Sequence, residues 1–202
     1  MTAILKVDTI QDTSGNNIIN ENAGTVTIGK AGNTTNIVGT LQNDGAALIS
    51  GITEADQWRI TANHSGVGDV TANWERNDST GFNYIGTGMT ESSGIFTFPS
   101  TGIYFIKFNT MNRITLGDTT YMAARILVTP DNFNYTEVSA NYVSLLNGAY
   151  GNAECNYIFD VTNTSTHKVK FRLAQNQNGT PVFQGYTDQN QTYATFIRLG
   201  DT

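Results

Sequence analysis

Charged side chains are scarce in this chain of 202 residues. Asp, Glu, Lys and Arg make up only 14% of it, whereas about a quarter is usual for a soluble domain. Asn, Thr, Ser, Gln and Gly fill the polar positions instead, as is frequent in extracellular β proteins. The net charge of −6 offers no basic face of the kind that general nucleic-acid binding requires, so we expect no nucleic-acid partner.

Cysteine is limited to Cys155, which excludes an internal disulfide framework. The residue lies in an alternating run in which Cys155, Tyr157, Phe159 and Val161 share one face of a predicted strand. One interpretation is a thiol buried in the core, and the other is a disulfide between two chains.

Long apolar runs are missing too. No stretch approaches the roughly 20 residues that a membrane helix needs. The N-terminus lacks the pattern of a secretory signal, because Lys6 and Asp8 interrupt residues 4–10. We therefore expect no membrane insertion, and a protein working outside a cell would have to arrive there by a route other than ordinary secretion.

Catalytic and metal-binding motifs are also missing. His64 and His167 lie far apart, in polar contexts that predict surface or turn positions, and neither has a metal-ligand spacing. Nucleophile-elbow, phosphate-loop and zinc-protease patterns do not occur. Four carboxylates could in principle supply a glycosidase pair, although acidic turn residues are the commoner explanation: Asp69, Glu75, Asp78 and Glu91. The sequence predicts a protein that is not an enzyme and needs no cofactor or metal.

What the chain does have is a β pattern centred on residues 94–110, GIFTFPSTGIYFIKFNT. Phe96 and Phe98 fall on one face of a short extended run, which ends at Pro99 because proline has no N–H for a ladder. Residues 100–102 are typical of a tight turn in which Gly102 adopts a positive φ. An aromatic and β-branched run follows over residues 103–108. These two runs predict the centre of a β core.

Further strands are predicted at the intervals of an all-β domain. In residues 167–173 the side chains alternate, with Val169, Phe171 and Leu173 on the inner face. No helical period is long enough to predict a helix. The remaining strands are expected at residues 121–129, 137–146, 153–161, 182–183 and 192–199. The predicted fold class is all-β, an antiparallel jelly-roll sandwich.

Residues 1–50 differ from residues 51–202. They contain no Trp, Tyr or Phe, and the pattern T-x-x-(I/V)-G occurs at residues 25–29 and again at 35–39. A segment this small and aliphatic cannot bury enough surface by itself. It is either a disordered leader or a stalk ordered by wrapping with identical segments of other chains. We predict an N-terminal anchor or stalk over residues 1–50 and a head domain over 51–202.

Residues 96–105 resemble a known family. Phe96, Pro99, Gly102 and Tyr104 match the F-x-x-P-x-x-G-x-Y-x-F signature of complement globular heads, relatives of the tumour necrosis factor jelly rolls, and Ile106 stands where the last Phe is expected. Residues 193–199 are similar to the closing strand of that family, with a Thr in place of its Gly.

Other stretches resemble proteins of marine tailed bacteriophages, of the cyanophage type. Residues 55–78 and 81–102 are similar to the opening of the head domain in their tail-fibre and virion proteins. Residues 3–19 are similar to the leader of the same proteins. The resemblance implies a virion structural protein.

The resemblance to the complement heads also implies a homotrimer. Residues 104–108 carry apolar groups on both faces of one strand, so one face is expected to pack in the sandwich and the other to meet the threefold axis. The basic stripe on residues 168–172 is either a solvated strand face or a seam against acidic groups of a neighbouring chain. The expected interface residues are Tyr104, Ile106, Phe108, Lys168, Lys170 and Arg172.

Three loops are candidates for receptor recognition, at residues 131–135, 147–152 and 176–180. A jelly roll tethered by its N-terminus would present the opposite rim outward, and loops on a rigid scaffold often carry recognition. Amide groups pair with sugar hydroxyls, and aromatic rings stack on the apolar face of a sugar. Ordinary turn chemistry explains the same composition. The candidate residues are Phe133, Tyr135, Asn147, Tyr150, Asn152 and Asn178.

The interpretation that follows is a trimeric bacteriophage tail fibre, located in the virion. Residues 1–50 would bind other virion proteins, and the head would attach to the host surface, with a host-surface glycan as one ligand. The alternative is a capsid decoration or head-fibre protein. A hydrolase of surface polysaccharide is a third hypothesis, which the absence of a catalytic motif disfavours.

Overall fold

The computed structural model describes residues 42–43, 46–47, 51–176 and 179–202. The chain divides into two compact units, Met1–Ile49 and Ser50–Thr202. In the first unit, β1 (Gln42–Asn43) pairs antiparallel with β2 (Ala46–Ala47), and the rest of the predicted leader lies outside the described residues. The described part of the chain contains no helix that could cross a membrane.

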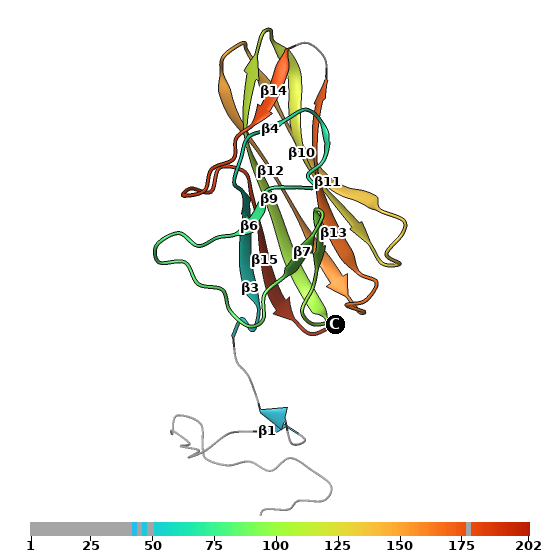
Figure 1. Ribbon diagram of the computed structural model, residues 1–202. Coiled ribbons are helices and arrows are strands. Elements are labelled where there is room, and N and C mark those ends of the chain that lie inside the picture. The colour runs from blue at the N-terminus through green and yellow to red at the C-terminus, as the bar shows by residue number, and fades with distance from the viewer. Residues whose placement is uncertain (1–41, 44–45, 48–50, 177–178) are drawn as a thin grey trace, which may run out of the picture. The chain divides into compact units, whose positions relative to one another are not determined.

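The second unit consists of two antiparallel sheets (Figure 1). The six-stranded sheet runs in the order β11 (Thr136–Leu145), β10 (Thr119–Thr129), β13 (Lys168–Asn176), β8 (Ile95–Thr97), β7 (Thr90–Ser92), and β5 (Gly68–Asp69) also pairs with β13. The seven-stranded sheet runs in the order β4 (His64–Ser65), β14 (Thr180–Phe183), β9 (Gly102–Thr115), β15 (Tyr193–Gly200), β3 (Ala55–Ile60), β6 (Trp74–Arg76), and β12 (Tyr150–Val161) pairs with β9. The predicted all-β sandwich is confirmed.

The corner at residues 98–101 carries the chain from one sheet to the other. β8 lies in the six-stranded sheet and β9 in the seven-stranded sheet, so the two runs predicted at the centre face each other across the core. The hydroxyl of Tyr104 lies 2.9 Å from Oγ of Ser100 and donates to its carbonyl oxygen at 3.1 Å. This tyrosine fixes the corner from within.

The core between the sheets is aromatic. Phe108 of β9 stacks on Phe171 of β13 with ring centroids 4.6 Å apart. Phe96 of β8 lies 5.5 Å from Phe171 and 5.3 Å from Phe196 of β15. All four side chains are buried, so each sheet contributes two rings to one cluster. Val169 and Leu173 are buried beside them, as predicted.

Two titratable residues of β12 and its neighbourhood belong to this core. Cys155 is buried, and burial raises the pKa of its thiol to about 12, which favours the structural thiol over a disulfide between chains. The predicted surface or turn position of His167 is wrong, because its ring stacks on Phe159 at 5.5 Å. The hydroxyls of Thr162 and Thr166 satisfy its two ring nitrogens.

The two ends of the sandwich are defined by strand register. Gly200 of β15 pairs with Ile103 of β9, and β3 begins beside Ile197, so the head's first strand starts at the end where the chain finishes (Figure 1). We call this the entry end. The turn at residues 146–149 follows the opposite end of β11 and begins β12 at Tyr150, beside Arg113. We call that the far end.

We expect Gly102→Ala to lower the free energy of unfolding by about 1–3 kcal/mol, because an L-residue is strained at this backbone conformation. Gly102 has a φ of +143°, and an added Cβ would lie 2.4 Å from Nε of Arg198 and 2.6 Å from the carbonyl oxygen of Gly200. Gly200→Ala, where a Cβ meets nothing within 4 Å, is the matched control and should change stability by less than about 0.5 kcal/mol. Urea unfolding measures both, and equal effects would contradict the strained corner.

Candidate functional site

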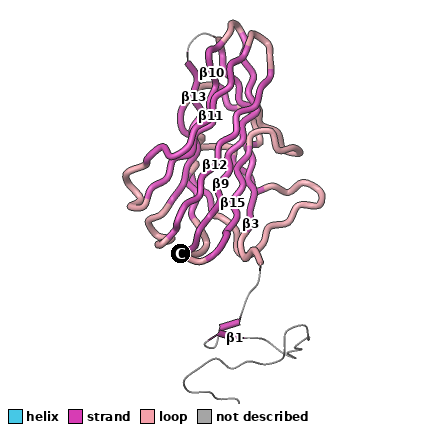
Figure 2. The backbone as a smooth tube through the Cα atoms, turned by 180° about the vertical axis from the view of Figure 1, so that it is seen from behind, coloured by secondary structure: helices cyan, strands magenta, loops and turns pink. Residues whose placement is uncertain are grey.

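The outer face of the seven-stranded sheet carries the candidate site. Figure 2 shows β12, β9, β15 and β3 side by side in that order. Paired residues of neighbouring strands point to the same face of a sheet. The register of the four strands therefore places their outward side chains in rows that run across the sheet.

One row, near the entry end, is apolar. Ile158 pairs with Phe105, Phe105 with Ile197, and Ile197 with Ala55. Ala55 forms a further bridge to Ile85. Ile158 is 58% exposed and Ile85 is 47% exposed. We call these five residues the apolar row, and such a continuous apolar band is unusual on the exposed face of a sheet.

The next row toward the far end is polar and consists of Asn156, Lys107, Thr195 and Gln57. Lys107 on β9 forms an ion pair with Glu154 of β12 at 2.7 Å. Gln57 of β3 donates from Nε2 to the hydroxyl of Thr195 on β15 at 2.9 Å. These polar contacts lie between the apolar row and the row that contains Arg59.

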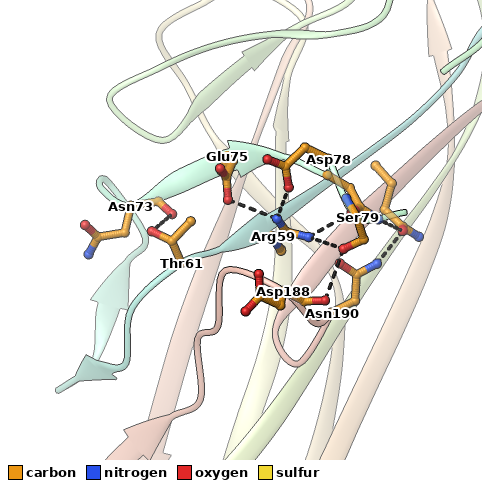
Figure 3. A network of polar contacts seen from close by, with 10 residues as sticks. Arg59, Thr61, Asn73, Glu75, Asp78, Ser79, Asp188 and Asn190 are labelled. Atoms are coloured by element: carbon orange, nitrogen blue, oxygen red, sulfur yellow. Dashed lines mark hydrogen bonds and ion pairs between the residues drawn. The ribbon is translucent and has the colours of Figure 1, made fainter. Parts of the chain in front are cut away.

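Arg59 stands in the third row, and its side chain is completely buried. Nη1 donates to Oδ1 of Asn77 at 2.8 Å and to Oγ of Ser79 at 2.7 Å. Nη2 forms ion pairs with Glu75 at 3.2 Å and with Asp78 (Figure 3). One guanidinium group thus organises residues 75–79 above the sheet.

The same network holds the segment of residues 188–191. Oγ of Ser79 donates to the carbonyl oxygen of Asp188 at 3.1 Å, and Nδ2 of Asn190 donates to Oε1 of Gln57 (Figure 3). Nδ2 of Asn109 on β9 donates to the carbonyl oxygen of Gln191 at 2.9 Å. The segment therefore stands as a wall over the outer face.

Between this wall and the sheet lies a cleft of about 500 Å³. Its floor is formed by Asn109, Met111 and Tyr193, its sides by residues 189–191 and by Asn152, and its far end by Tyr150. Nδ2 of Asn152 donates to Oδ1 of Asn109 at 2.6 Å, so the two amides are held side by side. Small-molecule sites commonly measure about 300–1,000 Å³, and this amide-lined cleft falls in that range.

The structure divides the six predicted receptor-binding residues. Tyr150 and Asn152 line the amide-lined cleft. Asn147 lies in the neighbouring turn, where its backbone N–H donates to Asp118 at 2.7 Å. Asn178 lies outside the described residues.

Phe133 and Tyr135 lie elsewhere, because their loop follows Thr129, which pairs with Lys168 at the entry end. The prediction that all three candidate loops lie at the far end is therefore wrong for the loop of residues 131–135. Asp131 accepts the backbone N–H groups of Asn134 and Phe133, and these bonds lower the pKa of its carboxyl. Turn chemistry accounts for this loop.

The basic stripe on β13 finds its carboxylate within its own chain. Asp69 of β5 accepts from Nζ of Lys170 at 2.7 Å and from Nε of Arg172 at 2.5 Å. Burial would raise the pKa of Asp69, but hydrogen bonds and charges of Arg172 and Lys170 outweigh it and lower that pKa. Lys168 is buried and donates to the carbonyl oxygen of Thr164 at 2.7 Å. Lys170 and Arg172 therefore pair with β5 of the same chain, and the seam against another chain stays a prediction.

The three apolar interface residues predicted on β9 also lie inside the chain. Tyr104, Ile106 and Phe108 are buried between the sheets, so they present no side chain to a partner. Because side chains alternate along a strand, the outward positions are Ile103, Phe105 and Lys107.

The four carboxylates considered for glycoside hydrolysis have structural contacts. Glu75 and Asp78 bind Arg59, and Asp69 binds the two basic residues of β13. Glu91 accepts the backbone N–H of Gly94 at 2.6 Å. The geometry brings Glu75 and Asp78 together around a cation, which is a structural arrangement.

Sequence reasoning missed Arg59, Asn109 and residues 189–191. Arg59 alternates with Trp58 and Ile60 in an amphipathic strand, which signals an outward position but gives no sign of a cover above it. The amide-rich run Gln189–Asn190–Gln191 is visible in the sequence. Its partner Asn109 is 82 residues from Gln191, so the pairing is a property of the fold.

The two antiparallel sheets define the head as a jelly-roll sandwich, and its fold is similar to that of tumour necrosis factor proteins. Among solved structures, murine APRIL at pH 5.0 is similar, with a TM-score of 0.54 and 14% identity over 72% of this chain and 98% of the other. Murine APRIL at pH 8.5 gives 0.52 and 12% over the same shares. Eiger TNF from S. frugiperda gives 0.53 and 9% over 73% and 93%. At these identities the likeness concerns the fold.

Comparisons of sequence give no relative beyond these similarities of fold. No family model matches the chain, and no curated protein sequence is similar to it.

We expect Arg59→Met to lower the free energy of unfolding by about 2–4 kcal/mol, because it removes a fully buried guanidinium that binds Glu75, Asp78 and the buried amide of Asn77. Arg59→Lys should rescue little of this, since an ammonium group cannot reproduce the fork of donors. Arg125→Met, which removes an ion pair to Glu137 at 2.9 Å and a contact with the ring of Tyr142, is the control and should cost about 0–1 kcal/mol.

Urea unfolding measures the three variants, and limited proteolysis reports whether residues 186–191 have become accessible. If Arg59→Met behaves like Arg125→Met in both assays, Arg59 does not hold the wall of the cleft.

Proposed function

We propose that this chain is the trimeric head and anchor of a bacteriophage virion fibre, a structural protein that attaches to the host surface. The observation that supports it best is the apolar row on the outer face of a tumour necrosis factor-type sandwich. A sister chain is the occupant that we propose for this surface. The resemblance of residues 96–105 to trimeric complement heads supports the same assembly.

Position and chemistry both favour sister chains on the apolar row. The row lies near the entry end, where residues 51–54 lead into β3. Chains that associate there bring their N-terminal segments together, which is what a small aliphatic leader needs in order to bury its surface. The flanking ion pair of Lys107 and Glu154 gives the contact a polar rim, as is usual around an apolar interface centre.

The virion assignment comes from the leader and from residues 55–102, which resemble phage tail-fibre and virion proteins. Residues 1–50 would bind another virion protein, and the head would contact the host. A capsid decoration or head-fibre protein shares this fold and assembly and differs only in what residues 1–50 bind.

The trimer is tested by the mass in solution. Light scattering of the purified chain at micromolar concentration should give three times the chain mass of 21.9 kDa. Ile158→Asp places a charge in the apolar row at its exposed β12 end and should yield monomers, because an unpaired buried charge disfavours association. Ile95→Asp, the same substitution at an exposed position of the other sheet, should leave the trimer intact. A monomeric wild-type chain would refute the assembly.

The proposed anchoring role of residues 1–50 is tested with virus particles. A chain lacking residues 1–50 should fold as a head that no longer joins virions, because the binding segment is gone. Gold labelling at the N-terminus of the full chain should mark the tail. Label on the capsid would select the decoration or head-fibre alternative, and normal incorporation of the truncated chain would overturn the anchor.

A further inference from the structure

We propose that the amide-lined cleft is the site at which the head binds its ligand, and that the ligand is a neutral glycan. This inference rests on the proposed function, because it names the ligand class and the residues for host-surface attachment. None of the residues that line the cleft, all of them in the described part of the chain, carries a formal charge. With a net charge of −6 on the chain, an anionic ligand has little to attract it.

The amides of the cleft are positioned before any ligand arrives. Asn109 uses both ends of its amide, donating to the carbonyl oxygen of Gln191 and accepting from Asn152. Asn152 is thereby oriented by one N–H, and its Oδ1 accepts no hydrogen bond within residues 51–176 and 179–202. Oδ1 of Asn190 also has no partner in this part of the chain, but it is buried from solvent. Asn152 is exposed, so its Oδ1 remains as the amide oxygen that can accept from a ligand hydroxyl.

The wall that carries Asn190 is held by Gln57 directly and by Arg59 through the hydroxyl of Ser79. A preorganised wall matters because each side chain that must be immobilised on binding weakens the affinity. Arg59 does not line the cleft and is a positioning residue.

Aromatic rings complete the site. Tyr150 is 55% exposed. Arg113, its pairing neighbour on β9, places its guanidinium 5.2 Å from the centroid of the tyrosine ring. Tyr193 lies opposite Asn109 on β15. Strand spacing separates the two tyrosine backbones by about 10 Å across the sheet and about 14 Å along it. An elongated ligand with hydroxyl edges and apolar ring faces matches this arrangement, and an oligosaccharide has both.

The full-length chain can be tested by isothermal titration with maltotriose, cellotriose, mannotriose and chitotriose as neutral probes and sialyllactose as the acidic probe. At least one neutral probe should bind. Tyr150→Ala should weaken that binding about tenfold, from the loss of ring stacking. Asn152→Ala should weaken it about 3- to 10-fold, from the loss of a hydrogen bond.

Two matched substitutions serve as controls. Tyr142→Ala removes an equally exposed tyrosine from β11 on the other sheet, and Asn156→Ala removes an exposed amide of β12 outside the cleft. Both should bind as the wild type does. Binding lost equally in controls and cleft variants, no binding of any neutral probe, or binding of sialyllactose alone would each overturn the proposal.

Light scattering of the same samples separates this proposal from the proposed function. A trimer that binds no neutral probe keeps the fibre and removes the glycan site. A monomer that binds a probe through Tyr150 and Asn152 keeps the site and removes the trimeric head.

Discussion

The contact of Phe108 with Phe171 across the sandwich decides which face of β9 is turned inward. Side chains alternate along a strand, so a shift of one residue would exchange the two faces completely. With Phe108 buried at 4.6 Å from Phe171, Phe105 and Met111 must point outward. The composition of the exposed sheet face is therefore a consequence of aromatic packing in the core.

Arg59 links that sheet face to the loops above it. A complete buried ion-pair network adds little net stability compared with well-packed apolar residues, because desolvation offsets much of the attraction, although removing one partner alone is costly. What it contributes here is geometry: a fork of donors fixes Asn77 and Ser79 at 2.8 and 2.7 Å, and Ser79 in turn holds residue 188. Without such a hub, residues 186–191 would be an ordinary surface loop, and the cleft would have no wall.

The sequence predicts the long strands well because their alternation extends over many residues. The sequence pattern does not divide residues 55–92 into strands, because β4, β5, β6 and β7 are only two or three residues long and lie among glycines. An apolar run such as residues 103–108 cannot reveal which face is buried, because both faces carry apolar groups. Only the partners of Phe108 on another sheet supply that information.

The sequence predicts the part of the candidate site that lies in one turn, but not the part that depends on strand pairing. Turn composition pointed to Tyr150 and Asn152, which stand where β12 begins. Asn109 and residues 189–191 join them only through pairing of β9 with β12 and β15. Contacts over 43 and 82 residues of sequence leave no local pattern, so composition can suggest the chemistry of a site without its boundary.

One sheet face thus offers two surfaces with opposite requirements. The apolar row is stabilised by excluding water, whereas unpaired amide oxygens need a ligand or solvent that can donate to them. Phe105 and Met111 are six positions apart on β9, about 20 Å along the strand. The polar row of Asn156, Lys107, Thr195 and Gln57 lies between them. Chains that associate through the apolar row can therefore leave the clefts open at the far end. Three weak sites on one trimer would then act together, raising the avidity for a surface of repeated sugars far above the affinity of a single cleft.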